Sequence, residues 1–247
     1  MIPLRWLRVL FGFAGVSFFI GLVDELCIWL LSSQLSHQII TGITTGVMVM
    51  LLAYHGGSVV RFVLGRKIAE GELVTKISAA ITLLRTDLLL VSSTPFPLHR
   101  TVLYESKNPA AFTMSDGGSY CIFLSSAMVQ KLTEDALACV IAHERGHMME
   151  YHPRKQSLIL GLLASVKATT GVTVVAVFIV LLTYLYMLRD WEYIADRRAV
   201  SMVGADRLIL AFTEFRNISG QKNISRLSEL MSSHPSIERR IAAVGRE

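Results

Sequence analysis

Apolar residues gather in three long blocks along the chain, and polar residues gather in the segments between them. The first two blocks cover residues 6–31 and 39–64. At about 1.5 Å rise per residue, each is long enough to cross a bilayer core of about 30 Å. The third block covers residues 157–188. This pattern predicts a membrane protein with a modest soluble part.

The stretch between the second and third blocks has the pattern of a small soluble α+β unit. Apolar residues recur at helical spacing between residues 68 and 90. Residues 101–105 predict a short strand. Segments 110–114 and 120–124 flank a polar turn that contains two glycines, which predicts a β-hairpin.

A helix is predicted to begin after Thr133, an N-cap residue type, and to end before Pro153. It carries an H-E-x-x-H run formed by His143, Glu144 and His147. Residues four apart share one helix face, so both imidazoles can reach a single metal ion. A catalytic zinc ion keeps one position open for water, and Glu144 is placed to take a proton from that water. The alternative is a surface helix with two ordinary histidines.

The third apolar block separates this helix from the acidic residues around Trp191. If a third metal ligand lies there, both ends of the block must emerge on the same side of the membrane. The chain must then enter and return, and residues 167–171 offer a turning point for a hairpin of two short helices. The alternative is one transmembrane helix over 172–188, which would put Trp191 and Glu192 on the far side.

Charges beside the first two blocks predict the orientation of the chain. Basic residues precede the first block and follow the second, whereas the connection 32–38 has no Lys or Arg. The positive-inside rule therefore puts the N-terminus and everything after the second block in the cytoplasm. Asp24 and Glu25 lie either at the far interface or as an acidic site inside the membrane. His55, followed by two glycines, marks a helix kink or a packing notch, or its side chain reaches the active site.

Composition adds few constraints beyond these. The chain is 52% hydrophobic, with a mean hydropathy of +0.50 and a net charge of +5. No basic tract interleaves with aromatic residues, so nucleic acid is not an expected partner. Cys27, Cys121 and Cys139 form no C-x-x-C pair, which predicts neither a disulfide framework nor a thiolate metal site.

A second motif follows the third block, in the run Arg189-Asp190-Trp191-Glu192-Tyr193-Ile194-Ala195-Asp196. With the H-E-x-x-H run and the apolar blocks, the chain resembles the membrane-embedded zinc metallopeptidases of the HtpX/Ste24 type (peptidase family M48), whose motif reads R-x-x-E-Y-x-A-D. The resemblance implies that Glu192 is the third zinc ligand. It also implies that Asp196 supports a ligating histidine and that Arg189 makes a charge contact near the site. Alone, Asp196 would equally suit a salt bridge.

Residues 233–241 are similar to the family's H-P-x-x-x-x-R-I stretch. Carried over, His234 would stabilise the oxyanion of the tetrahedral intermediate, and Arg240 would support the site. The alternative for His234 is a loop residue before a proline that begins a helix.

The family's substrate-binding strand commonly reads N-A-F-A, and this chain has Ala110-Ala111-Phe112-Thr113 in its place. We expect Ala111, Phe112 and Thr113 to form an edge strand that pairs with an extended substrate backbone. That pairing would lay the scissile carbonyl across the metal.

We therefore predict a mainly α membrane protein with about four membrane-embedded helices and a zincin-like α+β catalytic domain that carries a small β-hairpin or sheet. The expected divisions are a membrane anchor (1–66), two parts of the peptidase domain (67–155 and 189–247) and a membrane hairpin (156–188). The expected function is a zinc endopeptidase of the cytoplasmic (inner) membrane, with one Zn²⁺ per chain and its catalytic domain facing the cytoplasm.

Its expected substrates are proteins or peptides, cleaved in membrane protein quality control or processing. A rival from another class is a non-catalytic membrane scaffold that keeps a structural zinc site. A scaffold has no need of the base Glu144, which favours the enzyme.

Overall fold

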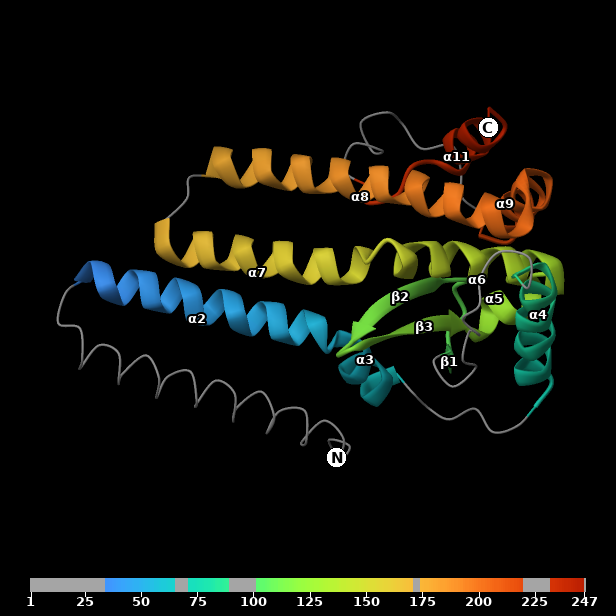
Figure 1. Ribbon diagram of the computed structural model, residues 1–247, viewed down its shortest axis with the longest axis horizontal. Helices are drawn as coiled ribbons and strands as arrows, with labels where there is room; N and C mark the ends of the chain where they lie inside the picture. The colour runs from blue at the N-terminus through green and yellow to red at the C-terminus, as the bar shows by residue number, and fades with distance from the viewer. Residues whose placement is uncertain (1–33, 65–70, 89–100, 171–173, 220–231, 247) are drawn as a thin grey trace.

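The computed structural model describes residues 34–64, 71–88, 101–170, 174–219 and 232–246 (Figure 1). The described part is mainly helical and carries one small mixed sheet, as predicted. Its helices, in chain order, are α2 (Gln34–Tyr54), α3 (Gly56–Leu64), α4 (Glu72–Leu88), α5 (Ser126–Lys131), α6 (Glu134–Met149), α7 (His152–Thr170), α8 (Val174–Val203), α9 (Ala205–Ser219) and α11 (Ile237–Val244).

Three strands, β1 (Thr101–Tyr104), β2 (Ala111–Asp116) and β3 (Ser119–Ser125), form the sheet in the order β1-β3-β2. Strands β2 and β3 are the predicted antiparallel hairpin, and β1 pairs with β3 in parallel. Gly117 in the turn has a φ of 62°, a conformation that favours glycine. Because β3 is central, β2 lies at an edge of the sheet.

Helix α6 packs against α4, α8 and α9 (Figure 1). Thr133 caps it as predicted, since its hydroxyl accepts from the Ala136 N–H at 3.2 Å. The apolar residues from Ala136 to Ala142 are buried, with only Val140 partly exposed, and they form much of the core. Cys121 and Cys139 are both buried in the core.

Close contact between α6 and α8 depends on a glycine. A Cβ atom on Gly146 would lie 2.6 Å from the backbone oxygen of Ala195, which is far inside normal contact distance. Gly146 precedes His147, and Ala195 lies within the second sequence motif. The glycine therefore allows the two motif-bearing helices to pack backbone against backbone.

Helices α7 and α8 form the predicted hairpin. Helix α7 runs away from the sheet, and α8 begins at the far end and returns (Figure 1). This arrangement brings Glu192 within 3.5 Å of His143, which contradicts a single membrane crossing between them. The return arm and the second motif form one 30-residue helix, because the sequence changes from apolar to polar there without a helix-breaking residue.

One bent helix pair is long and apolar enough to cross a membrane. It joins residues Gln38–Tyr54 and Gly56–Phe62, with an angle of 59° between them, and is identified by its length and composition only. No single helix in the described ranges is long and apolar enough to span a membrane. The bend confirms the kink expected at His55, whose exposed ring lies against the Gly117 turn.

Several sequence expectations lie outside the described residues. These are the first span (6–31) with Asp24 and Glu25, the last residue of the turning point (Gly171), and most of the loop expected at 219–223.

Candidate active site

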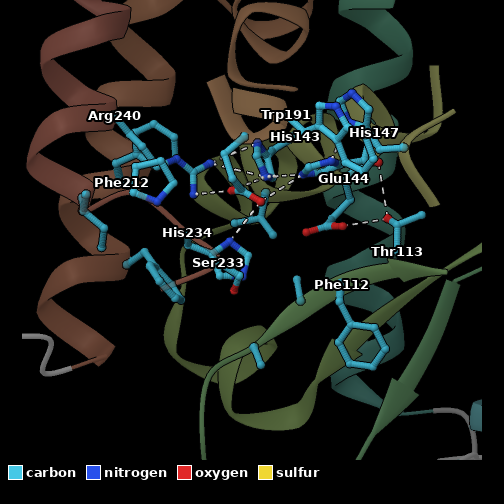
Figure 2. Close-up of a pocket in the computed structure, with 18 of the residues that line it drawn as sticks. Phe112, Thr113, His143, Glu144, His147, Trp191, Phe212, Ser233, His234 and Arg240 are labelled. Atoms are coloured by element: carbon cyan, nitrogen blue, oxygen red, sulfur yellow. Dashed lines mark hydrogen bonds and ion pairs between the residues drawn. The ribbon is translucent and has the colours of Figure 1, made fainter. Parts of the chain in front are cut away.

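The candidate metal ligands from the two motifs converge on one point. His143 and His147 come from α6 (Figure 2), and Glu192 comes from α8. The two histidine Nε2 atoms lie 3.1 Å apart. Glu192 Oε2 lies 3.5 Å from Nε2 of His143, and Oε1 lies 3.4 Å from Nε2 of His147.

This geometry fits a zinc ion. Ligand atoms held at about 2.0–2.1 Å in a tetrahedron lie about 3.3 Å from one another. The observed separations bracket that value, and two imidazoles plus one carboxylate form a known catalytic zinc set.

Behind His143 lies a buried ion-pair network. Asp196, which is 2% exposed, places Oδ1 at 2.8 Å from His143 Nδ1. Arg240 donates to both carboxylate oxygens of Asp196, at 2.6 and 2.8 Å. Its Nη1 also lies 3.1 Å from Glu192 Oε2, and its guanidinium covers the ring of Phe212. Arg240 therefore neutralises two buried acids at once.

The network shifts the pKa values of its members. Burial alone would raise the pKa of Glu192, but the charge of Arg240 and hydrogen bonds with three histidines hold it well below its ordinary value. Burial would likewise raise the pKa of Asp196, but the charge of Arg240 and hydrogen bonds with His143 and Arg240 lower it. Burial and Arg240 act to lower the pKa of His143, yet hydrogen bonds with Asp196 and Glu192 raise it to about 9.

Glu144 lies beside this cluster and contacts the edge strand. It is 6% exposed, and the hydroxyl of Thr113 donates to its Oε2 at 2.7 Å (Figure 2). Phe112 points away from Glu144 and stacks on Phe123, with ring centroids 4.9 Å apart. Thr113 and Glu144 therefore bring β2 to the cluster.

The segment before α11, which carries His234, closes the other side of the site and is held by Arg189 of α8. His234 Nδ1 lies 2.9 Å from Glu192 Oε1, and its side chain is 66% exposed. The hydrogen bond with Glu192 raises its pKa. Arg189 donates to the backbone oxygen of Ser232 at 3.0 Å. Arg189 thus holds the chain before His234.

A cavity of about 520 Å³ joins these groups. All three residues of the expected edge strand line it, together with His143, Glu144, His147, Glu192, His234 and Arg240. Beyond them its wall is largely apolar, formed by Met128, Val140, Leu208, Phe212, Phe215 and Ile237.

Sequence reasoning missed one residue at the centre of the site. His152 is 3% exposed and places Nδ1 at 2.9 Å from Nδ1 of His147. The available signal was a third histidine, five residues after His147 and next to Pro153. Its spacing lies off the helical face of the other two, so no periodicity pointed to it.

Curated relatives of this chain carry protease names. It is 26% identical over 161 residues to a protease HtpX homolog of Levilactobacillus brevis, covering 64% of this chain and 51% of that protein. It is 24% identical over 257 residues to protease HtpX of Haemophilus influenzae, covering 83% of this chain and 91% of that protein. The first match thus spans about half the length of its relative.

A solved structure has a similar fold. The crystal structure of S. mikatae Ste24p matches with a TM-score of 0.63 at 15% identity, and the match covers 98% of this chain and 64% of that chain. The sequence pattern of peptidase family M48 matches residues 81–247, well over half of the chain. This chain therefore belongs to peptidase family M48, as a metallopeptidase of the HtpX/Ste24 type.

Proposed function

We propose that this chain is a membrane-bound, zinc-dependent endopeptidase that cleaves proteins or peptides. The observation that carries the proposal is the set of ligand atoms on His143, His147 and Glu192, with the carboxylate of Glu144 beside it. The spacing of those atoms supports one zinc ion per chain.

Bound zinc would supply a Lewis acid and a water molecule with a pKa of about 7. Glu144 then acts as the general base that takes a proton from the water and returns it to the leaving amine. His234 donates to the oxyanion that forms on the substrate carbonyl. Asp196 holds His143, and Arg240 balances the charge of Glu192.

The outer edge of β2 is the proposed substrate platform. Within the described residues β2 pairs only with β3, so an extended peptide can add as a further strand beside Ala111, Phe112 and Thr113. Main-chain pairing there would fix the peptide next to Glu144, which Thr113 already contacts. This mode accepts many sequences, which suits quality control or processing of membrane proteins.

Exposed apolar faces support attachment to a bilayer. On α2 and α7 the exposed large apolar residues recur every four positions, along one face of each helix. They are Ile39, Ile43, Val47 and Leu51 on α2, and Leu158, Leu162 and Val166 on α7. Contiguous faces of this kind suit lipid rather than water.

With basic residues flanking the first two blocks, we propose the cytoplasmic (inner) membrane, with the site facing the cytoplasm. The proposed divisions are an anchor (1–66), a peptidase domain in two parts (67–155 and 189–247) and a membrane hairpin (156–188).

The test compares Glu144→Gln with the wild type in purified, detergent-solubilised full-length protein. We expect the variant to keep its zinc and to lose cleavage of an unfolded protein such as casein. Metal content by mass spectrometry and fragment analysis on gels measure the two properties separately. Cleavage by Glu144→Gln at the wild-type rate would remove Glu144 from the proposed role, and zinc-free wild-type protein that cleaves fully would overturn the metal mechanism.

A further inference from the structure

His152 is a buried polar residue to which the proposed mechanism gives no role. It is the first residue of α7 and is 3% exposed. The chain reaches it through Tyr151, whose φ of 57° turns the backbone between α6 and α7. That turn brings the His152 ring back against His147, with ring centroids 5.1 Å apart.

The geometry of His147 fixes which of its nitrogens would bind zinc. Its Nε2 lies 3.1 Å from Nε2 of His143 and 3.4 Å from Oε1 of Glu192, so Nε2 belongs to the metal cluster. A neutral imidazole that binds through Nε2 carries its proton on Nδ1. That Nδ1 lies 2.9 Å from Nδ1 of His152, at hydrogen-bond distance.

His152 must then act as the acceptor in this bond. Its Nδ1 has to be unprotonated, which leaves its proton on Nε2. Within the described part of the chain, the buried Nε2 has no hydrogen-bond partner. An unpartnered buried N–H is costly, so packing alone does not explain a histidine at this position.

The ring of His152 is held in place from its other side. It stacks on Trp191, with centroids 4.8 Å apart and an angle of 4° between the planes. Trp191 directly precedes Glu192 on α8. His152 thus connects a candidate ligand on α6 to the helix that supplies the third one.

We propose that His152 is a positioning residue that fixes the tautomer and ring orientation of His147 and thereby strengthens zinc binding. The inference rests on the proposed zinc site. The two histidine ligands then differ in what supports them. His143 is supported by the anion Asp196, and His147 is supported by a neutral imidazole. Partners of this kind change metal affinity by about 10- to 100-fold.

Two substitutions separate the acceptor from the stack. His152→Phe keeps an aromatic ring against Trp191 but removes the acceptor. His152→Asn removes the ring but keeps an acceptor, because Asn Oδ1 and His Nδ1 are both bonded to Cγ. His55→Phe is the matched control, since His55 is exposed and does not line the cavity.

The measurements use the full-length protein in detergent: zinc affinity by chelator competition, the visible spectrum of the Co²⁺-substituted protein, and thermal unfolding of the metal-free form. We expect His152→Phe to weaken zinc binding about 10- to 100-fold and to change the Co²⁺ spectrum, with the metal-free melting temperature unchanged. His152→Asn should stay within about threefold of the wild-type zinc affinity, well below that loss. His55→Phe should bind zinc as tightly as the wild type.

Wild-type zinc affinity in His152→Phe would overturn the inference, as would an equal loss in the Phe and Asn variants. Failure of the proposed function is recognised separately, because there the wild-type protein itself would bind no zinc.

Discussion

Thr113 Oγ1 lies 2.7 Å from Glu144 Oε2, so a hydroxyl on the edge strand donates to the proposed general base. Thr113 Oγ1 also lies 3.3 Å from the backbone oxygen of Glu144, but the shorter contact with the carboxylate is charge-assisted and is the stronger one. The strand that this segment resembles commonly carries alanine at this position. The hydroxyl therefore gives this chain an additional means of orienting its base.

Thr113→Val is expected to lower kcat about 10- to 100-fold, because a hydrogen bond to a charged group contributes about 1.5–3 kcal/mol. Valine keeps the shape of the side chain and its preference for strands, so KM should change little. Steady-state kinetics on a fluorogenic peptide measures both constants. Thr113→Ser keeps the donor and should retain most activity; equal kcat values for Val and wild type would show that the contact has no catalytic effect.

Asp196→Asn should damage both the metal site and the fold. The change leaves Arg240 buried with one carboxylate partner in place of two, and breaking a buried ion pair costs about 3–5 kcal/mol. It also removes the anion that supports His143, so zinc affinity should fall about 10- to 100-fold. Chemical denaturation and chelator competition measure the two effects. Wild-type values in both assays would contradict the network described above.

Zinc binding should release a proton, because the pKa of metal-free His143 is about 9. A raised pKa means that the protonated ring stabilises the metal-free fold below its ordinary value of 6.5, and that this contribution is lost as the pH rises through about 9. Zinc needs the neutral ring, so between these limits its affinity should rise about tenfold per pH unit.

Calorimetry near pH 7.5 in buffers of different ionisation enthalpy should give close to one proton per zinc from this group. Asp196→Asn should release less, because its His143 loses the partner that holds the proton. Zinc binding with no proton release in the wild type would be inconsistent with this electrostatic account.

Gly146→Ala is expected to destabilise the protein, although alanine normally stabilises a helix by about 1 kcal/mol relative to glycine. The added Cβ would meet the Ala195 backbone at 2.6 Å and push α8 away from α6. We expect a loss of about 1–3 kcal/mol, typical of overpacking, together with weaker zinc binding. Gly118→Ala is the control, because a Cβ there meets nothing within 4 Å. A stabilised Gly146→Ala variant would disprove the close helix contact.

The local features of the site could be predicted because they depend on short-range rules. The four-residue spacing of His143 and His147 puts both on one helix face, Thr133 has a side chain that caps a helix, and the glycine turn joins two alternating strands. The hairpin followed from a geometric condition, namely that residues around Trp191 return to the metal helix.

Other features depend on tertiary packing. The role of His152 arises from a single left-handed residue, Tyr151, and no periodic pattern encodes that turn. Likewise, Thr113 was expected only as part of a substrate strand. Its contact with Glu144 depends on how the sheet packs against α6, which hydrophobic alternation does not define. Glu192 was identified through family resemblance and not through spacing.

Zinc stoichiometry tests whether His143, His147 and Glu192 hold one catalytic ion. It is measured by mass spectrometry on wild-type and Glu192→Ala protein after chelation and reconstitution, and casein cleavage is followed on the same samples. We expect about one zinc per wild-type chain and cleavage restored by the metal, whereas Glu192→Ala should bind zinc weakly and should not cleave. Full zinc occupancy and wild-type cleavage in Glu192→Ala would show that the ion is not held between α6 and α8 as described.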